Sequence, residues 1–257
     1  MGESINLPTK SKVGLRDSAK RYRYLSCASS PRVRGAVALP KGDGAAAGRR
    51  VRSVWDFVEF TDEEMARQRG RYEPLTDSVR QLIDATLRTE VGDDEVASAM
   101  AEIDAITARL RTHQRDGAPS VSLTPDGEWV SWGDVASGLR NPLAPPLSIQ
   151  HDSPSRAHLD VQLGAAYVGA PGHLHGGYGA LILDHILGDV ASLGSAETAA
   201  ATGTITFRYH QPTRLGRLHA EAEIQRTEGR KIFVVGQLAD SEGVTLTAEG
   251  VYFPLRQ

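Results

Sequence analysis

The spacing of apolar residues changes along the chain, most sharply near residue 147. From there onward apolar and polar residues alternate with a period of two, which is typical of β-strands that have one face in water. The connection DSEG at 240–243 is short, so neighbouring strands are expected to pair as antiparallel hairpins. Six segments are predicted as strands: 147–151, 158–167, 202–210, 217–227, 231–239 and 244–253.

One helix interrupts these strands, at about 176–193, with the sequence GGYGALILDHILGDVASL. Its middle is apolar almost all round, and a helix that is apolar on every side is a buried helix. The pattern therefore predicts an α+β domain at 147–257, in which an antiparallel sheet wraps around one long central helix. The residues that make the helix apolar are Ala180, Leu181, Ile182, Leu183, Ile186, Leu187 and Val190.

An N-terminal helical segment is predicted before this domain, at 53–116. It begins with Thr61 and Glu64, whose spacing satisfies the first free backbone donors of a helix. Pro74 is expected to separate two helices. A further helix opens at Asp93 and places apolar residues on one face, at Val96, Met100, Ile103 and Leu110. The segment is either a partner-binding module or a cover packed on the domain that follows, and we favour the cover.

Residues 117–146 resemble a linker and approach loop, with NP at 141–142 and APP at 144–146. Trp129 and Trp132 lie in this stretch. Aromatic residues in a linker are usually anchors packed on the neighbouring domain. We therefore prefer that interpretation to one in which they line a ligand channel.

Composition limits the remaining possibilities. The chain has 257 residues, 40% hydrophobic and 24% charged, and a net charge of −3 that gives no general attraction for nucleic acid. Twelve Lys and Arg against three acids mark residues 1–52, and we expect a disordered basic tail there rather than a targeting peptide. A single cysteine, Cys27, excludes an internal disulfide. No membrane span or secretory signal is recognised, so we expect a cytoplasmic protein.

A carboxylate stands in the middle of the predicted buried helix, at Asp184. Its neighbours one turn away include Ala180 and Gly188, so its own helix offers no cation to pair with it. Burying an unpaired carboxylate is costly, and residues with such a cost cluster at functional sites. The alternative is a structural Asp that bonds to a loop or points to a wet subunit interface.

His175, Gly176 and Gly177 stand at the start of the same helix. The first amides of a helix are unpaired donors at the positive end of its dipole, an arrangement suited to an oxyanion. From His175 to Asp184 is nine residues, or about 13 Å along one helix. The two groups are therefore expected to meet only between two antiparallel copies of the helix, across a dimer interface.

Several other site classes are disfavoured. His173 and His175 have the spacing of a metal pair, but no third ligand follows at a suitable interval, so no metal is expected. The chain lacks the G-x-S-x-G turn of serine hydrolases, the third glycine of a dinucleotide fingerprint and any phosphate-binding P-loop.

The segments PGHLHGGYGALILDHILG, TGTITFRYHQPTRLG and EGRK together resemble the PaaI-type hotdog-fold acyl-CoA thioesterases. The resemblance covers about 141–257. It implies a hotdog fold, homodimers or tetramers with the active site at the subunit interface, and hydrolysis of acyl-CoA. Coenzyme A would enter as part of the substrate, with no separate cofactor.

The same resemblance implies roles for particular residues. Asp184 would be the general base or the nucleophile, and the Gly176 amide would hold the oxyanion. His175 would orient the thioester carbonyl, and Thr202 would hold the attacking water. Arg230 and Lys231 would meet the phosphates of coenzyme A. One departure is Gly169, which stands where some relatives place a catalytic Asn.

Two other functions stay open at this point. A non-catalytic acyl-CoA sensor would bind ligand in the same pocket, but it has no need of a buried carboxylate. A hotdog dehydratase would need an Asp–His pair. His185 lies about 100° around the helix from Asp184, which is a poor position for sharing a substrate.

Overall fold

The computed structural model describes residues 50–52, 56–117, 121–124, 129–194 and 198–255. All of them belong to one compact unit, Ala46–Gln257. The predicted basic tail and Cys27 lie outside the described residues, apart from the backbone of 50–52. The choice between a disordered tail and a targeting peptide therefore stays a prediction.

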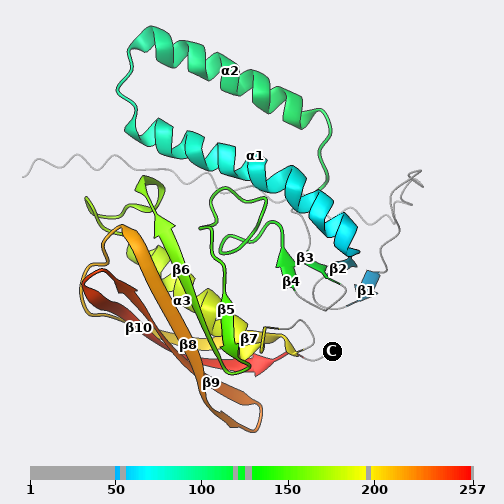
Figure 1. Cartoon of the computed structure of the whole chain (residues 1–257), viewed down its shortest axis with the longest axis vertical. Helices are drawn as coiled ribbons and strands as arrows, with labels where there is room; N and C mark the ends of the chain where they lie inside the picture. Colours follow the sequence, from blue (N-terminus) through cyan, green and yellow to red (C-terminus); the bar gives the residue numbers. More distant parts are fainter. Residues whose placement is uncertain (1–49, 53–55, 118–120, 125–128, 195–197, 256–257) are drawn as a thin grey trace, which may run out of the picture. The chain divides into compact units, whose positions relative to one another are not determined.

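A six-stranded antiparallel sheet forms the C-terminal part of the chain, and it confirms the six predicted strands (Figure 1). Its order is β5-β6-β8-β9-β10-β7, so β5 and β7 are the edges. The hairpin between β9 and β10 turns at the predicted DSEG sequence. The strands are β5 (Gln150–Ser153), β6 (Arg156–Leu163), β7 (Ala200–Tyr209), β8 (Gly216–Glu228), β9 (Lys231–Asp240) and β10 (Gly243–Pro254).

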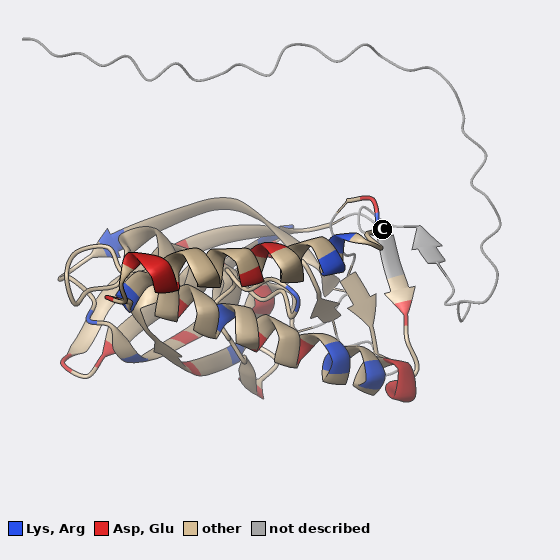
Figure 2. Cartoon of the chain, turned by 90° about the horizontal axis from the view of Figure 1, so that it is seen from above, with Lys and Arg blue, Asp and Glu red and all other residues tan. Residues whose placement is uncertain are grey.

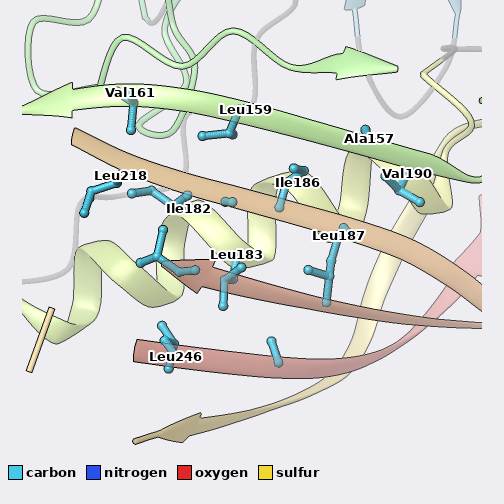
Figure 3. Close-up of a cluster of buried hydrophobic side chains, with 14 of the residues drawn as sticks. Ala157, Leu159, Val161, Ile182, Leu183, Ile186, Leu187, Val190, Leu218 and Leu246 are labelled. Atoms are coloured by element: carbon cyan, nitrogen blue, oxygen red, sulfur yellow. The ribbon is translucent and has the colours of Figure 1, made fainter. Parts of the chain in front are cut away.

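The predicted helix forms as α3 (Gly176–Ala191) and packs against β6, β7, β8, β9 and β10. Ile182, Leu183, Ile186 and Leu187 are completely buried between the helix and the sheet (Figure 3). Leu159, Leu218 and Leu246 extend the same core from the strands. Apolar burial of this kind is the main stabilising contribution to a fold. This arrangement confirms the predicted hotdog fold.

The sheet does not surround α3 completely, and in this respect the prediction of a helix buried on every side is wrong. Ala180, Asp184 and Gly188 follow one another at intervals of one turn and are all partly exposed. His185 and Asp189 widen the same exposed strip. Ala180, Leu181 and the glycines are small or apolar, so the sequence pattern did not distinguish this strip from the buried side.

The stretch predicted as a linker contains short strands that the sequence pattern did not reveal. Four strands, β1 (Arg50–Arg52), β2 (Asp56–Glu59), β3 (Val121–Leu123) and β4 (Trp129–Ser131), form a second sheet in which β2 and β3 run parallel. Of these, β3 and β4 lie in the predicted linker, β2 lies in the segment predicted as helical, and β1 lies at the end of the predicted tail. Strands of three or four residues are too short to show a period of two. A one-turn helix, η1 (Ala165–Tyr167), lies between β6 and α3.

The first long helix, α1 (Asp62–Arg88), begins at the predicted capping box of Thr61 and Glu64. The prediction that Pro74 separates two helices is wrong, because α1 continues through it. Proline removes one backbone hydrogen bond. Met65 and Thr76 are buried on either side of Pro74, so packing holds the helix together across the missing bond.

The two N-terminal helices differ in what they contact. Arg80 of α1 donates hydrogen bonds to the carbonyl oxygens of Ala144 (3.0 Å) and Asn141 (3.4 Å), and α1 also packs on η1. By contrast, α2 (Asp93–Arg111) has no buried residue. None of the described helices is long and apolar enough to cross a membrane.

Replacing Leu187 with alanine tests the core, because Leu187 is fully buried against the sheet. We expect the free energy of unfolding to fall by about 2–5 kcal/mol, from lost burial and the cavity that remains. Urea denaturation measures it. Leu87→Ala is the matched control, since Leu87 is 57% exposed and its loss should change stability by less than about 0.5 kcal/mol. Equal losses in the two variants would contradict this account of the core.

Candidate functional site

Asp184 is partly exposed and has one hydrogen-bonding partner. The Thr202 hydroxyl, on β7, donates to its Oδ1 atom at 3.1 Å. The expectation of an unpaired buried carboxylate is therefore wrong, because the partner comes from a strand rather than from the helix. Oδ2 makes no hydrogen bond or ion pair to another described residue and stays available to a water molecule or a ligand.

A β-bulge accompanies Thr202. Val251 of β10 lies opposite Thr204, but the next residue, Tyr252, lies opposite Thr202, so Gly203 is an extra residue in β7. A bulge of this kind re-aims the side chains beside it. A Cβ atom on Gly203 would lie 2.3 Å from the Phe253 ring, so any larger residue would displace that ring.

Tyr252 is completely buried close to Asp184 and Thr202. Its hydroxyl makes no hydrogen bond of normal geometry to a described residue. Burial raises the pKa of Tyr252, the charge of Asp184 raises it further, and the nearby Thr202 hydroxyl opposes both effects. The phenol therefore stays protonated and remains a potential donor near the carboxylate.

The His175-Gly176-Gly177 sequence begins α3 as expected, with His175 as the N-cap. His175 Nδ1 accepts a hydrogen bond from the Gly177 amide at 3.1 Å, which leaves the proton of a neutral ring on Nε2. The Tyr209 hydroxyl donates to the Gly176 carbonyl oxygen at 3.0 Å. Within the described chain the Gly176 amide has no acceptor, so it is free to bind an anion.

Tyr209 is a site residue that sequence reasoning did not single out. It ends β7, and its ring lies against Gly176, where an added Cβ would be 3.2 Å from it. The signal was present in the Y-x-x-P sequence at 209–212, which contributed to the family resemblance but was given no role.

The loop before α3 explains the glycine at position 169. The Gly169 amide bonds to the His173 carbonyl oxygen, and the His175 amide bonds to the Tyr167 carbonyl oxygen, both at 2.9 Å. A Cβ atom on Gly169 would lie 2.7 Å from the His175 Cα. No side chain fits there with this loop conformation, so an Asn at 169 would need a different loop.

A cavity of about 650 Å³ opens beside Asp184. The N-terminal part of the chain contributes Arg69, Trp129 and Leu139 to its lining. Trp129 therefore lies on the cavity wall, where the less favoured interpretation of this residue, as part of a ligand channel, expected it. Trp132 is buried, but it packs within the N-terminal part of the chain: it clusters with Met65 and Val130 and donates a hydrogen bond to Ser122 at 2.8 Å.

Two histidines lie on the same cavity. His151 Nε2 is 2.6 Å from Asp189 Oδ2. Burial lowers the pKa of His185 below its usual range, although the charges of Asp189, Asp134 and Asp184 act in the opposite direction. His185 is therefore neutral at physiological pH and adds no positive charge beside Asp184.

The structure does not bring the other predicted residues to this cavity. Arg230 and Lys231 lie at the turn between β8 and β9, both exposed, and neither lines the cavity. Arg230 donates a hydrogen bond to the Pro254 carbonyl oxygen at 3.4 Å. Among the described residues, no group of three or more His, Cys, Asp or Glu side chains is arranged to hold a metal ion.

Comparisons with known proteins agree with this geometry. The family model of the thioesterase superfamily matches residues 171–247, which include α3 and most of the sheet. A sequence comparison with curated proteins gives no match.

Solved structures give further matches. The crystal structure of RHA08564, a thioesterase superfamily protein, is 33% identical, covers 71% of this chain and 90% of that protein, and has a TM-score of 0.62. The PaaI protein of the E. coli phenylacetic acid degradation operon is 15% identical, with coverage of 43% and 80% and a TM-score of 0.39. A phenylacetic acid degradation-related protein from Ralstonia eutropha JMP134 is 18% identical, with coverage of 42% and 83% and a TM-score of 0.39.

The first of these relatives spans both the hotdog part and much of the N-terminal segment, because it covers more of this chain than the sheet and α3 contain. With α3 wrapped by an antiparallel sheet and the family model matched over the site, the chain belongs to the thioesterase superfamily.

Proposed function

We propose that this protein hydrolyses acyl-CoA thioesters to a free acid and coenzyme A, with Asp184 as the catalytic carboxylate. Membership of the superfamily supports thioester hydrolysis in general. The observation that carries the specific proposal is the Asp184–Thr202 hydrogen bond at the edge of an open cavity. Thr202 occupies Oδ1 and fixes the carboxylate, which leaves Oδ2 without a hydrogen bond to another described residue.

Two routes are compatible with this arrangement. In the first, Oδ2 takes a proton from water while the water oxygen attacks the thioester carbonyl, and the thiolate of coenzyme A leaves. In the second, Oδ2 attacks directly to form an anhydride, which water then cleaves. Single-turnover hydrolysis in ¹⁸O-labelled water separates them, because only the anhydride route places the label in Asp184 itself.

The oxyanion donor is proposed to come from a second copy of the chain. Asp184 and Gly176 are eight residues apart on one helix, or about 12 Å along its axis, which is too far for one carbonyl group. Two antiparallel α3 helices would bring the Asp184 of one copy to the Gly176 amide of the other. Support comes from β7, an edge strand whose side chains are mostly exposed and whose free edge could pair with another strand.

The same proposal assigns roles to His175, Arg230 and Lys231. His175 would orient the substrate carbonyl through its Nε2–H, since Nδ1 is already engaged. Arg230 and Lys231 would meet coenzyme A phosphates only if the nucleotide reached the β8–β9 turn of either copy. A cytoplasmic location and the absence of a separate cofactor remain predictions.

Asp184→Asn is expected to lower kcat for acyl-CoA hydrolysis by roughly 10²–10⁴-fold, because an amide cannot take up the proton of water. Thiol release from an acyl-CoA series measures it. Asp160→Asn is the matched control, since Asp160 is an exposed carboxylate on β6 and should leave kcat unchanged. Full activity of Asp184→Asn would reject the catalytic role, and acyl-CoA binding without turnover in the wild type would favour the sensor.

Gly176→Pro tests the oxyanion donor. Proline is well tolerated at the first position of a helix but has no N–H, so kcat should fall by roughly 10²–10³-fold while the fold survives. Gly176→Ala is the control, because it adds the same Cβ beside Tyr209 and retains the amide. An equal loss in both variants would point to crowding at Tyr209 instead.

Mixing the two inactive variants tests the shared site. If each site takes Asp184 from one copy and the Gly176 amide from the other, a refolded equimolar mixture of Asp184→Asn and Gly176→Pro should regain about a quarter of wild-type activity. Half of the dimers are then mixed, and each mixed dimer has one intact site. A mixture that stays inactive would place both groups in one copy.

A further inference from the structure

The lining of the Asp184 cavity includes a polar pair that the proposed reaction does not use. His151 of β5 and Asp189 of α3 are joined at 2.6 Å, and their side chains are 30% and 29% exposed. Both line the cavity together with Asp184. The rest of the lining mixes apolar residues with Arg69, His185 and several serines. Polar groups at fixed positions in such a cavity orient a ligand.

The pair is held in place from several sides. Gly194 has a φ of +66°, and a Cβ atom there would lie 2.9 Å from His151 Nε2, so the bare backbone of this turn packs against the ring. Asp189 fixes the same nitrogen. His151 Nδ1 has no hydrogen-bonding partner among the described residues, so it can still bond to a ligand.

The spacing between the reaction centre and the pair sets a length. Asp184 and Asp189 are five residues apart on α3, which is about 7.5 Å along the helix axis and about 140° around it, so this axial separation is the least distance between the two positions. An extended chain advances about 1.2 Å per bond. A polar atom roughly six bonds beyond the thioester carbonyl carbon would therefore reach the pair.

The N-terminal segment forms the wall of the cavity that faces α3. Trp129, Val130 and Ser131 of β4 line it together with Leu139 and with Arg69 of α1. Residues that precede the hotdog domain therefore limit what can lie between Asp184 and the His151–Asp189 pair.

We propose that this cavity receives an acyl group of medium length whose far end carries a hydrogen-bonding group, met by the His151–Asp189 pair, and that Trp129 limits its width. This inference rests on the proposed thioesterase function. It assigns His151 and Asp189 to substrate selection and gives the N-terminal segment a part in the site.

Two acyl-CoAs of equal length provide the test: 6-hydroxyhexanoyl-CoA and heptanoyl-CoA, which differ by a hydroxyl in place of a methyl group. The wild type should have a kcat/KM about tenfold higher for the hydroxy substrate, because a hydrogen bond to the pair replaces water. His151→Phe and His151→Gln should lower or abolish this preference while heptanoyl-CoA is still hydrolysed. Trp129→Ala should raise kcat/KM for branched or longer chains.

The outcomes separate this inference from the proposed function. Hydrolysis without a preference for the hydroxy substrate overturns the inference and leaves the function standing. A uniform loss for every acyl chain in the His151 and Trp129 variants would mean that the cavity holds the pantetheine arm, which also overturns it. If the wild type hydrolyses neither substrate, the function fails, and calorimetric binding of the same two molecules decides the inference: tighter binding of the hydroxy compound supports it, and equal binding rejects it.

A second, independent feature is the apolar face of α2. Val96, Met100, Ile106 and Leu110 are 40–60% exposed, and no residue of the helix is buried. Val96, Met100, Ile103 and Leu110 follow at steps of four, three and seven, which is the spacing of a seam between two helices. Thr107 occupies the remaining seam position, and Ile106 lies at the edge of the seam. A 19-residue helix with such a seam is incomplete without a second helix against it.

The charges of α2 indicate what the second helix is. Asp93, Asp94 and Glu95 occupy its first turn, and Arg109 and Arg111 its last turn. Figure 2 shows this separation as a red end and a blue end of the helix. An antiparallel second copy of α2 would place each acidic end beside a basic end, and one symmetric contact would satisfy both.

We also propose that α2 pairs with α2 of a second copy in antiparallel orientation. Met100→Glu combined with Ile103→Glu should halve the mass of the full-length protein in sedimentation equilibrium, whereas Ser98→Glu, on the opposite face, should not change it. Asp94→Arg and Arg109→Glu should each weaken the assembly, and their combination should restore it. An unchanged mass, or a loss of melting temperature alone, would overturn the proposal, because α2 would then pack within its own chain.

Discussion

The buried row of α3 is the contact on which the rest of the molecule depends. Ile182, Leu183, Ile186 and Leu187 have no exposed surface and hold the sheet around the helix (Figure 3). Since this row fixes the rotation of α3, it also determines which residues face away from the sheet. Asp184 lies on that open strip, and the cavity exists because the sheet leaves the strip uncovered.

Edge strand β7 contacts both halves of the candidate site, the Asp184 carboxylate and the start of α3. Its bulge at Gly203 accompanies the Thr202 hydroxyl that bonds to Asp184, and its last residue, Tyr209, holds the Gly176 carbonyl. One strand therefore positions the groups at the middle of α3 and at its start. A shift of β7 would move both together, so any contact that a second copy makes with this edge would act directly on the chemistry.

Much of the fold could be predicted because the signals are local. Alternation with a period of two gave all six strands of the main sheet, and an apolar helix among them gave α3. The errors have physical causes as well. Pro74 lies inside α1 because tertiary packing compensates for one lost hydrogen bond, and β3 and β4 are too short to carry a period. The cavity could not be predicted, because Arg69, Trp129 and His151 are far apart in the sequence and line the same cavity only in the folded chain.

The partial exposure of Asp184 changes the physical argument for its function. Burying an unpaired carboxylate costs free energy, and that cost would itself indicate a functional role. Because Asp184 is partly exposed, its role needs a different physical argument. That argument is geometric: Thr202 bonds to one oxygen, the buried Tyr252 phenol lies nearby, and Asp184 lines a cavity of about 650 Å³. A carboxylate held on one side and open on the other is arranged to act on water. In the proposed reaction the hotdog domain would supply the reactive carboxylate, while Arg69, Trp129 and Leu139 of the preceding segments line the cavity beside it.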